Sequence, residues 1–188
     1  MAWAWIENGH LFISYSRDVI PANVEVMEVP DDNPQVTVDN GQLRPKTDEE
    51  ILNEVKSSML SRLIYHTQRY IEQYYPETKQ RSDIADKEIY ESVLVLNQID
   101  PTQVRANITR IVLQYYDNFN EGLQALLSIY NNQDLAFAFE QLLKVGYRLR
   151  FVYLVKQEYY NLKQSIENAT SLDNLNTIQI QFQTRYPL

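Results

Sequence analysis

The spacing of hydrophobic residues changes at Thr47 and divides the chain into two regions. Before Thr47 the apolar residues stand in short runs separated by turn residues, as in residues 3–6, 11–15, 24–29 and 36–38. After Thr47 they recur every three or four residues, the spacing of one face of an α-helix. The pattern predicts an α+β fold, in which a small N-terminal β-hairpin or open sheet segment precedes a predominantly α-helical bundle of about five helices.

Two Asn-Gly pairs mark the turns of the N-terminal region. Asn8-Gly9 and Asn40-Gly41 each follow one β-prone run and precede another. Both residue types accept the positive φ of a type I′ turn, so each pair predicts a two-residue hairpin. Residues 24–29 form a further strand candidate, which the proline-containing residues 30–34 interrupt. A sheet of this size has open edges, and open edges can pair with another chain.

The helical region begins at a capping box formed by Thr47 and Glu50, whose side chains can each accept the backbone N–H of the other residue. The first helix ends near Tyr75, because Pro76 lacks an N–H and clashes with the preceding turn. Further helices are predicted over residues 84–97, 101–130, 134–166 and 172–182, followed by a C-terminal tail over residues 185–188.

Polar residues mark the starts of the later helices. Ser82 and Asp83 are placed to accept hydrogen bonds from the free N–H groups of the second helix. Asp100 precedes Pro101, an order typical of a cap followed by the first helical residue. Asp134 is the predicted cap of the fourth helix.

The switch in pattern predicts two parts, a β-rich attachment segment, residues 1–46, and a helical domain, residues 47–188. The attachment segment carries more aromatic surface than a hairpin of its size can bury. Such side chains pack on the helical domain, on another chain, or on both, and the sequence leaves these alternatives open. Because Trp and Tyr often anchor interfaces, we select four partner-binding candidates. These are Trp3, Trp5, Phe12 and Tyr15.

Composition narrows the classes of partner. The formal net charge of −8 disfavours non-specific binding to nucleic acid, which requires an excess of Lys and Arg. Lys144, Arg148 and Arg150 stand close together, and we interpret them as a solvated helix face. The chain has no cysteine, which excludes disulfides and thiolate metal sites. Residues 1–7 do not form a signal peptide, and no apolar run approaches the ~20 residues that span a bilayer, so we expect a soluble protein made in the cytoplasm.

The sequence contains no arrangement typical of an enzyme, and we predict no catalytic residue, metal site or cofactor. His10 and His66 are the only histidines, and neither has a ligand-like partner three or four residues away. All four glycines are isolated, which excludes a glycine-rich phosphate loop. Paired carboxylates can cleave glycosides, but acidic residues near a helix start are the simpler interpretation of the acidic cluster after Pro76. This cluster consists of Asp83, Asp86, Glu88 and Glu91.

The residues around Pro76 resemble a known family. The run IEQYYPETKQRSDIADK, residues 71–87, is similar to the YPxTKQxSDxxDK sequence of short tail-module proteins of tailed bacteriophages, which are often described as tail-fibre or tail-fibre-assembly proteins. The resemblance covers residues 50–96 and 163–183, and it implies a small β-rich N-terminal segment ahead of the helices. Residues 101–160 depart from the family pattern.

The turn after Tyr75 has two interpretations. In the structural one, Pro76, Ser82 and Asp83 do no more than end one helix and start the next. In the functional one, the basic residues of the turn form an exposed docking surface that the flanking helices hold in place. The candidate docking residues are Lys79, Gln80 and Arg81.

The resemblance implies a non-enzymatic structural or adaptor protein of a phage tail, a tail-fibre or baseplate component. Its partners would be other phage tail proteins, with self-association left open, and neither nucleic acid nor a membrane. Its location would be the tail of the virion, after assembly in the host cytoplasm. Two alternatives are a tail-fibre assembly chaperone that is absent from the particle, and a helical protein-binding module of non-viral origin.

Overall fold

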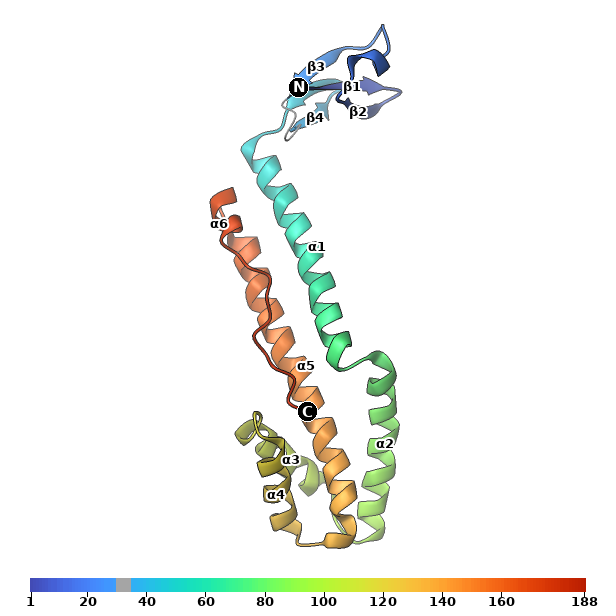
Figure 1. Ribbon diagram of the computed structural model, residues 1–188, viewed down its shortest axis with the longest axis vertical. Helices are drawn as coiled ribbons and strands as arrows, with labels where there is room; N and C mark the ends of the chain where they lie inside the picture. Colours follow the sequence, from blue (N-terminus) through green and yellow to red (C-terminus); the bar gives the residue numbers. More distant parts are fainter. Residues whose placement is uncertain (30–34) are drawn as a thin grey trace. The chain divides into compact units, whose positions relative to one another are not determined.

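The computed structural model describes residues 1–29 and 35–188, so the interruption expected at residues 30–34 lies outside the described residues. The chain divides into two compact units (Figure 1). The sheet unit consists of residues 1–59 and 169–176, and the helical unit consists of residues 60–168 and 177–188. The predicted α+β fold, with an N-terminal antiparallel sheet region followed by helices, is confirmed.

The sheet unit holds two antiparallel sheets. In the three-stranded sheet β1 lies between β2 and β3, and in the two-stranded sheet β4 pairs with β5. The strands are β1 (Ala2–Glu7), β2 (His10–Ser14), β3 (Val26–Val29), β4 (Val36–Asp39) and β5 (Gln42–Pro45).

Both predicted hairpin turns are present. Asn8 and Gly9 have φ values of 52° and 80°, and Asn40 and Gly41 have values of 51° and 80°. Positive φ at both central residues is the requirement of a type I′ turn, whose twist matches that of the flanking strands. The first turn sets a register in which Trp5 of β1 lies opposite Phe12 of β2.

One face of β1 carries small residues, and the second hairpin packs on it. This core consists of Ala2, Ala4, Val29 and Val36, with Met27 and Leu43 packed against it. Because successive residues of a strand point to opposite faces, Trp3 and Trp5 lie on the other face of the sheet. This cluster contains no aromatic side chain, and the one aromatic side chain that the described part of the sheets buries, Trp5, lies on the opposite face.

Helix α1 (Asp48–Tyr74) begins at the predicted capping box, which is confirmed. The Glu50 carboxylate accepts the N–H of Thr47 at 2.8 Å, and the N–H of Glu50 donates to the Thr47 hydroxyl at 3.3 Å. Arg44 of β5 donates two further bonds of 2.7 Å to the same carboxylate. Hydrogen bonds from Arg44 and Thr47 lower the pKa of Glu50 to about 2. The capping box thus joins the last strand to the first helical turn.

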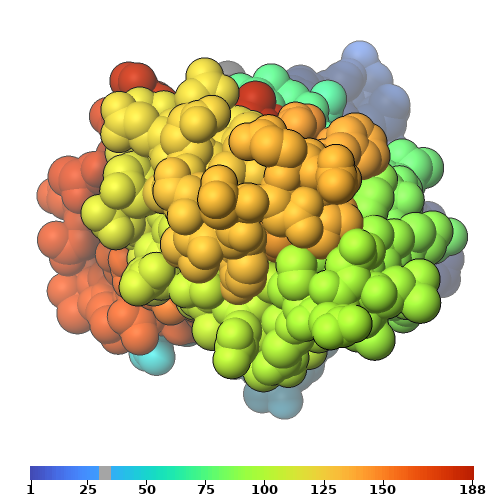
Figure 2. Space-filling model, turned by 90° about the horizontal axis from the view of Figure 1, so that it is seen from below, coloured from blue at the N-terminus to red at the C-terminus, as the bar shows by residue number. Residues whose placement is uncertain are grey.

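The helical unit is arranged around α5, against which α2, α3 and α4 each pack (Figure 1). Figure 2 views the end of this unit where α2 and α4 reach the first turns of α5. The helices are α2 (Glu77–Leu96), α3 (Pro101–Gln114), α4 (Phe119–Tyr130) and α5 (Ala136–Asn168); the short α6 (Leu172–Asn176) belongs to the sheet unit.

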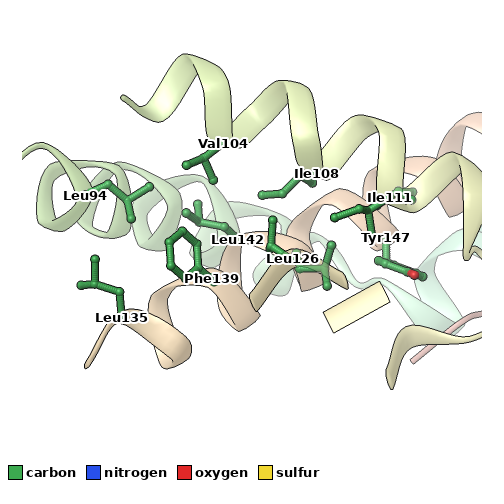
Figure 3. Packing of buried hydrophobic residues seen from close by; sticks show 11 residues of the cluster. Leu94, Val104, Ile108, Ile111, Leu126, Leu135, Phe139, Leu142 and Tyr147 are labelled. Atoms are coloured by element: carbon green, nitrogen blue, oxygen red, sulfur yellow. The ribbon is translucent and has the colours of Figure 1, made fainter. Parts of the chain in front are cut away.

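The core of the helical unit surrounds two aromatic rings (Figure 3). Phe139 and Tyr147, both on α5, are fully buried. Their neighbours come from α2, α3, α4 and α5, and full burial of each such side chain contributes about 1.5–3 kcal/mol. The aliphatic members are Leu94, Val104, Ile108, Ile111, Val112, Leu126, Leu135, Leu142 and Leu143.

Gly122 allows α4 to approach α5 closely. A Cβ atom at this position would overlap the hydroxyl oxygen of Tyr147 and lie 3.1 Å from a methyl carbon of Ile111. The Tyr147 hydroxyl donates a hydrogen bond of 2.6 Å to the carbonyl oxygen of Tyr115. Moving this hydroxyl to make room would therefore cost a hydrogen bond.

Two predicted helix starts are wrong. Helix α2 starts at Glu77, directly after Pro76, rather than at Ser82 and Asp83. Pro76, with φ −63° and ψ 154°, is the residue that precedes the helix, so only Tyr75 and Pro76 separate α1 from α2. Asn132, rather than Asp134, provides the cap before α5, because a short 3-10 turn, Gln133–Leu135, precedes the helix and its first free N–H groups lie earlier in the chain.

Two other helix predictions are also wrong. The helix predicted over residues 101–130 is divided into α3 and α4, because the Asn118 side chain accepts the N–H of Glu121 at 3.2 Å and starts a new helix. The last predicted helix ends at Asn176 instead of continuing to residue 182. The Asp100 cap, by contrast, is confirmed by its 2.8 Å bond from the N–H of Thr102.

Candidate functional site

The four aromatic candidates of the sheet unit have different environments. Trp5 is only 6% exposed and stacks on Phe12 across the strand pair, with ring centroids 5.6 Å apart. Phe12 and Tyr15 are 42% and 66% exposed, and Trp3 is half-buried. Phe12 and Tyr15 therefore offer apolar surface to a partner, while Trp5 supports Phe12 from β1.

Exposed apolar side chains continue along β2. This strand lies at an edge of its sheet, and no other strand among the described residues pairs with its outer side. Leu11 and Ile13 lie on one face of this strand and Phe12 on the other, and Tyr15 follows the strand directly. Exposed apolar side chains beside an unpaired strand edge are typical of an interaction site. We call this site the β2 surface; it consists of Leu11, Phe12, Ile13 and Tyr15, which are all exposed.

The three candidates in the turn between α1 and α2 do not form one exposed surface. Lys79 is half-buried, and its ammonium nitrogen lies 2.8 Å from the carboxylate of Asp83. The Gln80 side chain donates a 2.8 Å hydrogen bond to the carbonyl oxygen of Tyr75, which would otherwise lack a partner at the end of α1. Of the three, Arg81 alone is exposed, and it pairs with Glu77 one turn earlier.

Asp83 is the centre of a buried polar cluster that joins α2 to α5. Its carboxylate side chain is 3% exposed, and each of its oxygens lies 2.9 Å from Nη1 of Arg148. Lys79 and the hydroxyl of Tyr75 also donate to it. Burial by itself raises the pKa of Asp83, but hydrogen bonds from Lys79, Arg148 and Tyr75 outweigh burial and hold the pKa below its usual value.

Arg148 does not lie on a solvated face with Lys144 and Arg150, so that prediction is wrong for this residue. Its side chain is 13% exposed. Burial by itself lowers the pKa of Arg148, whereas Tyr186 and Asp83 raise it, and the pKa is higher than usual. The partner of Arg148 lies 65 residues earlier in the chain, a distance at which local spacing gives no signal.

The C-terminal segment, residues 177–188, is a second notable feature and was not predicted. It is extended and is held to the helical unit through its backbone. The Glu158 carboxylate accepts the N–H of Gln183 at 2.7 Å and the N–H of Thr184 at 2.8 Å, and also accepts the Thr184 hydroxyl. The hydroxyls of Tyr70 and Tyr116 donate to the carbonyl oxygens of residues 184 and 185, at 2.6 and 2.9 Å.

Two aromatic rings fix the side chains of the segment. Phe182 stacks on Tyr70 with ring centroids 5.2 Å apart. The ring of Tyr186 lies 5.5 Å from that of Tyr74 and 5.2 Å from that of Phe151. The Tyr186 hydroxyl accepts a hydrogen bond of 3.3 Å from Nε of Arg148, so the segment also contacts the Asp83 cluster.

An alternating pattern could have identified this segment. Ile178, Ile180, Phe182, Thr184 and Tyr186 are all partly buried, and the residues between them are exposed. Burial of every second residue is typical of an extended chain. The sequence prediction instead joined residues 178 and 182 to α6, because their spacing also fits a helix.

No group of three or more His, Asp or Glu residues in the described part of the chain is arranged to hold a metal ion. Within the same residues no helix is long and apolar enough to cross a membrane. Three members of the acidic cluster after Pro76 make side-chain contacts: besides Asp83, Asp86 accepts the Ser82 hydroxyl at 3.1 Å, and Glu91 lies 3.6 Å from Arg105.

No protein-family model, curated protein or solved structure matches the chain.

Proposed function

We propose that this protein is a non-enzymatic structural or adaptor component of a bacteriophage tail, a tail-fibre or baseplate protein that acts by binding other phage tail proteins. Its proposed location is the tail of the virion, which it reaches after assembly in the host cytoplasm. The proposal is supported by the likeness of residues 71–87 to tail-module proteins and by the β2 surface.

The proposed binding role rests on one observation: β2 combines an open strand edge with exposed apolar side chains. A partner strand added to this edge would satisfy unpaired backbone groups while Phe12 and Tyr15 supply apolar contacts. The core beneath the strand is made of small residues of β1, β3 and β4 that are buried within the sheet unit itself. A partner could therefore bind the edge without disturbing that core.

The electrostatics of Asp83 support a non-enzymatic role. It is the most buried carboxylate in the acidic cluster. Donors on Lys79, Arg148 and Tyr75 occupy it and lower its pKa. A general acid or base works best with a pKa near the operating pH, so this carboxylate is suited to joining helices rather than to transferring protons.

The proposal is tested by expressing the tagged chain with the tail proteins of the phage that encodes it and measuring co-purification. Tyr15→Asp should reduce recovery of the tail partner at least tenfold, because it places a charge on the β2 surface. The matched control is Tyr160→Asp, an equally exposed tyrosine on α5, which should leave recovery unchanged. Equal recovery with both variants would contradict attachment through β2.

Mass spectrometry of purified particles distinguishes the structural role from the assembly-chaperone alternative. A stoichiometric amount of the chain in the particle is the expected result. Binding to a tail protein during assembly together with absence from the finished particle would favour the chaperone instead.

A further inference from the structure

The contacts of the C-terminal segment are those of a bound peptide. Four hydrogen bonds hold the backbone of residues 183–185: the Glu158 carboxylate accepts two N–H groups, and the hydroxyls of Tyr70 and Tyr116 donate to two carbonyl oxygens. Recognition of backbone atoms fixes an extended peptide without regard to its exposed side chains. We call the surface that provides these contacts the segment groove; it consists of Tyr70, Tyr74, Tyr116, Arg148, Phe151 and Glu158.

Side-chain specificity comes from two positions four residues apart. Phe182 meets Tyr70, and Tyr186 meets Tyr74, Phe151 and Arg148. Thr184, between them, donates its hydroxyl to Glu158. The groove therefore selects the pattern Phe-x-Thr-x-Tyr in an extended conformation, whereas the side chains of Gln183 and Arg185 are exposed.

The donors of the groove are protonated at neutral pH. Burial, followed by the nearby Tyr74 and Glu158, raises the pKa of Tyr70 above its usual value. Burial also raises the pKa of Tyr116, with Asp117 as the next cause. Both hydroxyls thus keep the proton that they donate to the peptide backbone, and hydrogen bonds to the charged Glu158 are stronger than those between neutral groups.

The groove is therefore matched to one sequence, which every copy of this chain carries. The residues before the anchored part, 177–181, have no regular secondary structure, and the preceding α6 belongs to the other unit. The same contacts form whether residues 182–186 come from the same chain or from a neighbour. The two arrangements differ in the path and surroundings of the connecting residues, of which Ile178 and Ile180 are partly buried.

We infer that the segment groove is a binding site for an extended Phe-x-Thr-x-Tyr peptide, and that its partner is residues 182–186 of a second copy of this chain. A short tether gives the chain's own segment an effective concentration on the order of 1 mM. Isolated dilute chains therefore hold their own segment, and exchange between copies becomes dominant where copies are concentrated or held side by side. The inference does not depend on the phage assignment.

Complementation between two full-length variants tests this inference. The segment variant, Phe182→Ala with Tyr186→Ala, keeps an intact groove and cannot fill it. The groove variant, Tyr70→Phe with Glu158→Gln, keeps an intact segment and holds it weakly. Analytical ultracentrifugation of the mixture should show a one-to-one heterodimer that forms at least tenfold more tightly than dimers of either variant, because only the mixture contains an intact groove and a free intact segment.

Hydrogen exchange and a control variant identify the contact. In the mixture, exchange of the Thr184 N–H of the isotopically labelled groove variant should slow at least tenfold, since Glu158 of the other chain now binds it. The control, Gln183→Ala with Arg185→Ala, changes exposed side chains of the same segment and should form no heterodimer with the segment variant. Absence of a heterodimer and unchanged exchange, in variants that retain their helical circular dichroism, would overturn the inference.

A second measurement uses a chain in which both the segment groove and the C-terminal segment are intact. It tests exchange between copies even if the segment variant or the groove variant fails to fold. A photo-reactive benzoylphenylalanine replaces the exposed Gln181, which lies beside Tyr65 and Arg69 of α1. Light and heavy isotope forms are unfolded, mixed and refolded together at concentrations up to about 1 mM. Hybrid light–heavy cross-links between residue 181 and α1 should increase with concentration; cross-links that remain within one chain at every concentration would overturn the inference.

Discussion

The two units of this protein differ in the size of the side chains that they bury. In the sheet unit the cluster between the two sheets consists mainly of Ala and Val side chains and Trp5 is buried on the other face, while Phe12 of β2 and Tyr15 directly after β2 are exposed. In the helical unit Phe139, Tyr147 and Phe151 are fully buried. Large buried side chains contribute most of the hydrophobic stabilisation of a domain. The comparison is consistent with the proposal that the helical unit provides most of the stability and that the sheet unit provides surface for a partner.

The charged residues show the same contrast. Arg44 and Glu50, at the edge of the sheet unit, form a pair whose side chains are 36% and 37% exposed, whereas Asp83 and Arg148 are 3% and 13% exposed. Exposed pairs contribute about 0–1 kcal/mol. A buried pair makes folding depend on both partners, because either charge left alone in the interior is costly.

The largest expected effect comes from removing residues 1–44. The truncated chain, starting at Pro45, should remain soluble and helical by circular dichroism and should no longer co-purify with the proposed tail partner. The separate small core of the sheets supports this expectation, although the independent folding of residues 47–188 stays a prediction. Aggregation of the truncated chain, or co-purification at full strength, would show that the two units do not divide stability and binding in this way.

Among single substitutions in the helical unit, Asp83→Asn should have the largest effect. It should lower the free energy of unfolding by about 3–5 kcal/mol at neutral pH, because it leaves Arg148 buried without a counter-charge. Urea unfolding followed by circular dichroism measures this loss. The matched control, Asp86→Asn, changes a more exposed carboxylate one turn later and should cost about 1 kcal/mol or less.

The Asp83 contribution should also depend on pH. The pKa of Asp83 is lower in the folded state than in the unfolded chain, where an Asp titrates near ~3.9. Its stabilisation is therefore complete above that unfolded value and is lost as pH falls through the lower folded value. The gap in stability between the natural chain and Asp83→Asn should stay constant down to about pH 4 and then narrow; a gap that changes between neutral pH and about pH 5 would point to another group.

Gly122→Ala should reveal how tightly the helical unit is packed. The added methyl group overlaps the Tyr147 hydroxyl, and overpacking of this kind costs about 1–3 kcal/mol. Thermal unfolding measures the loss. The comparison variant is Ala125→Gly, also on α4. It tests helix propensity together with the loss of one partly buried methyl group, and should cost about 1–2 kcal/mol.

The smallest predicted effect concerns the start of α3. Asp100→Ala should lower the free energy of unfolding by about 1 kcal/mol, because the N–H of Thr102 loses its acceptor. The exposed Gln103 in the same turn provides a control, and Gln103→Ala should change stability by about 0.5 kcal/mol or less. Equal denaturation midpoints for both variants would mean that the cap contributes nothing to the helical unit.

Local chemistry allowed much of the fold to be predicted from the sequence. Asn8-Gly9, Asn40-Gly41, the Thr47–Glu50 capping box and the Asp100 cap all act over two to five residues, and each is present. The break at Asn118 had the same kind of signal, since Asn118 and Glu121 stand at capping-box spacing. That signal was hidden because apolar residues continue at helical spacing on both sides of it.

The rest depends on contacts between residues far apart in the chain. Asp83 resembles a helix cap in sequence, and its burial follows from Arg148 on α5. Lys79 and Gln80 resemble an exposed basic turn, and their acceptors, Asp83 and the carbonyl of Tyr75, lie only four and five residues away. What the sequence does not reveal is that Asp83 is itself buried against α5, which draws Lys79 inward. The C-terminal segment likewise has no internal ladder of hydrogen bonds, and its conformation is set by Glu158 and three tyrosines that no local pattern connects to it.

The two Asn-Gly turns also limit the chemical lifetime of the sheet unit. Asn8 and Asn40 are exposed, and each is followed by glycine. The backbone nitrogen of the glycine can attack the side-chain carbonyl of the asparagine, which releases ammonia and forms a succinimide. Thermostable proteins contain fewer asparagines for reasons of this kind. Water opens this ring to aspartate or isoaspartate, and isoaspartate adds one carbon to the main chain. At Asn8 that carbon would shift the register that places Phe12 opposite Trp5. The chemical lifetime of the β2 surface is thus set by the rate of succinimide formation at Asn8, and it does not depend on the stability of the helices.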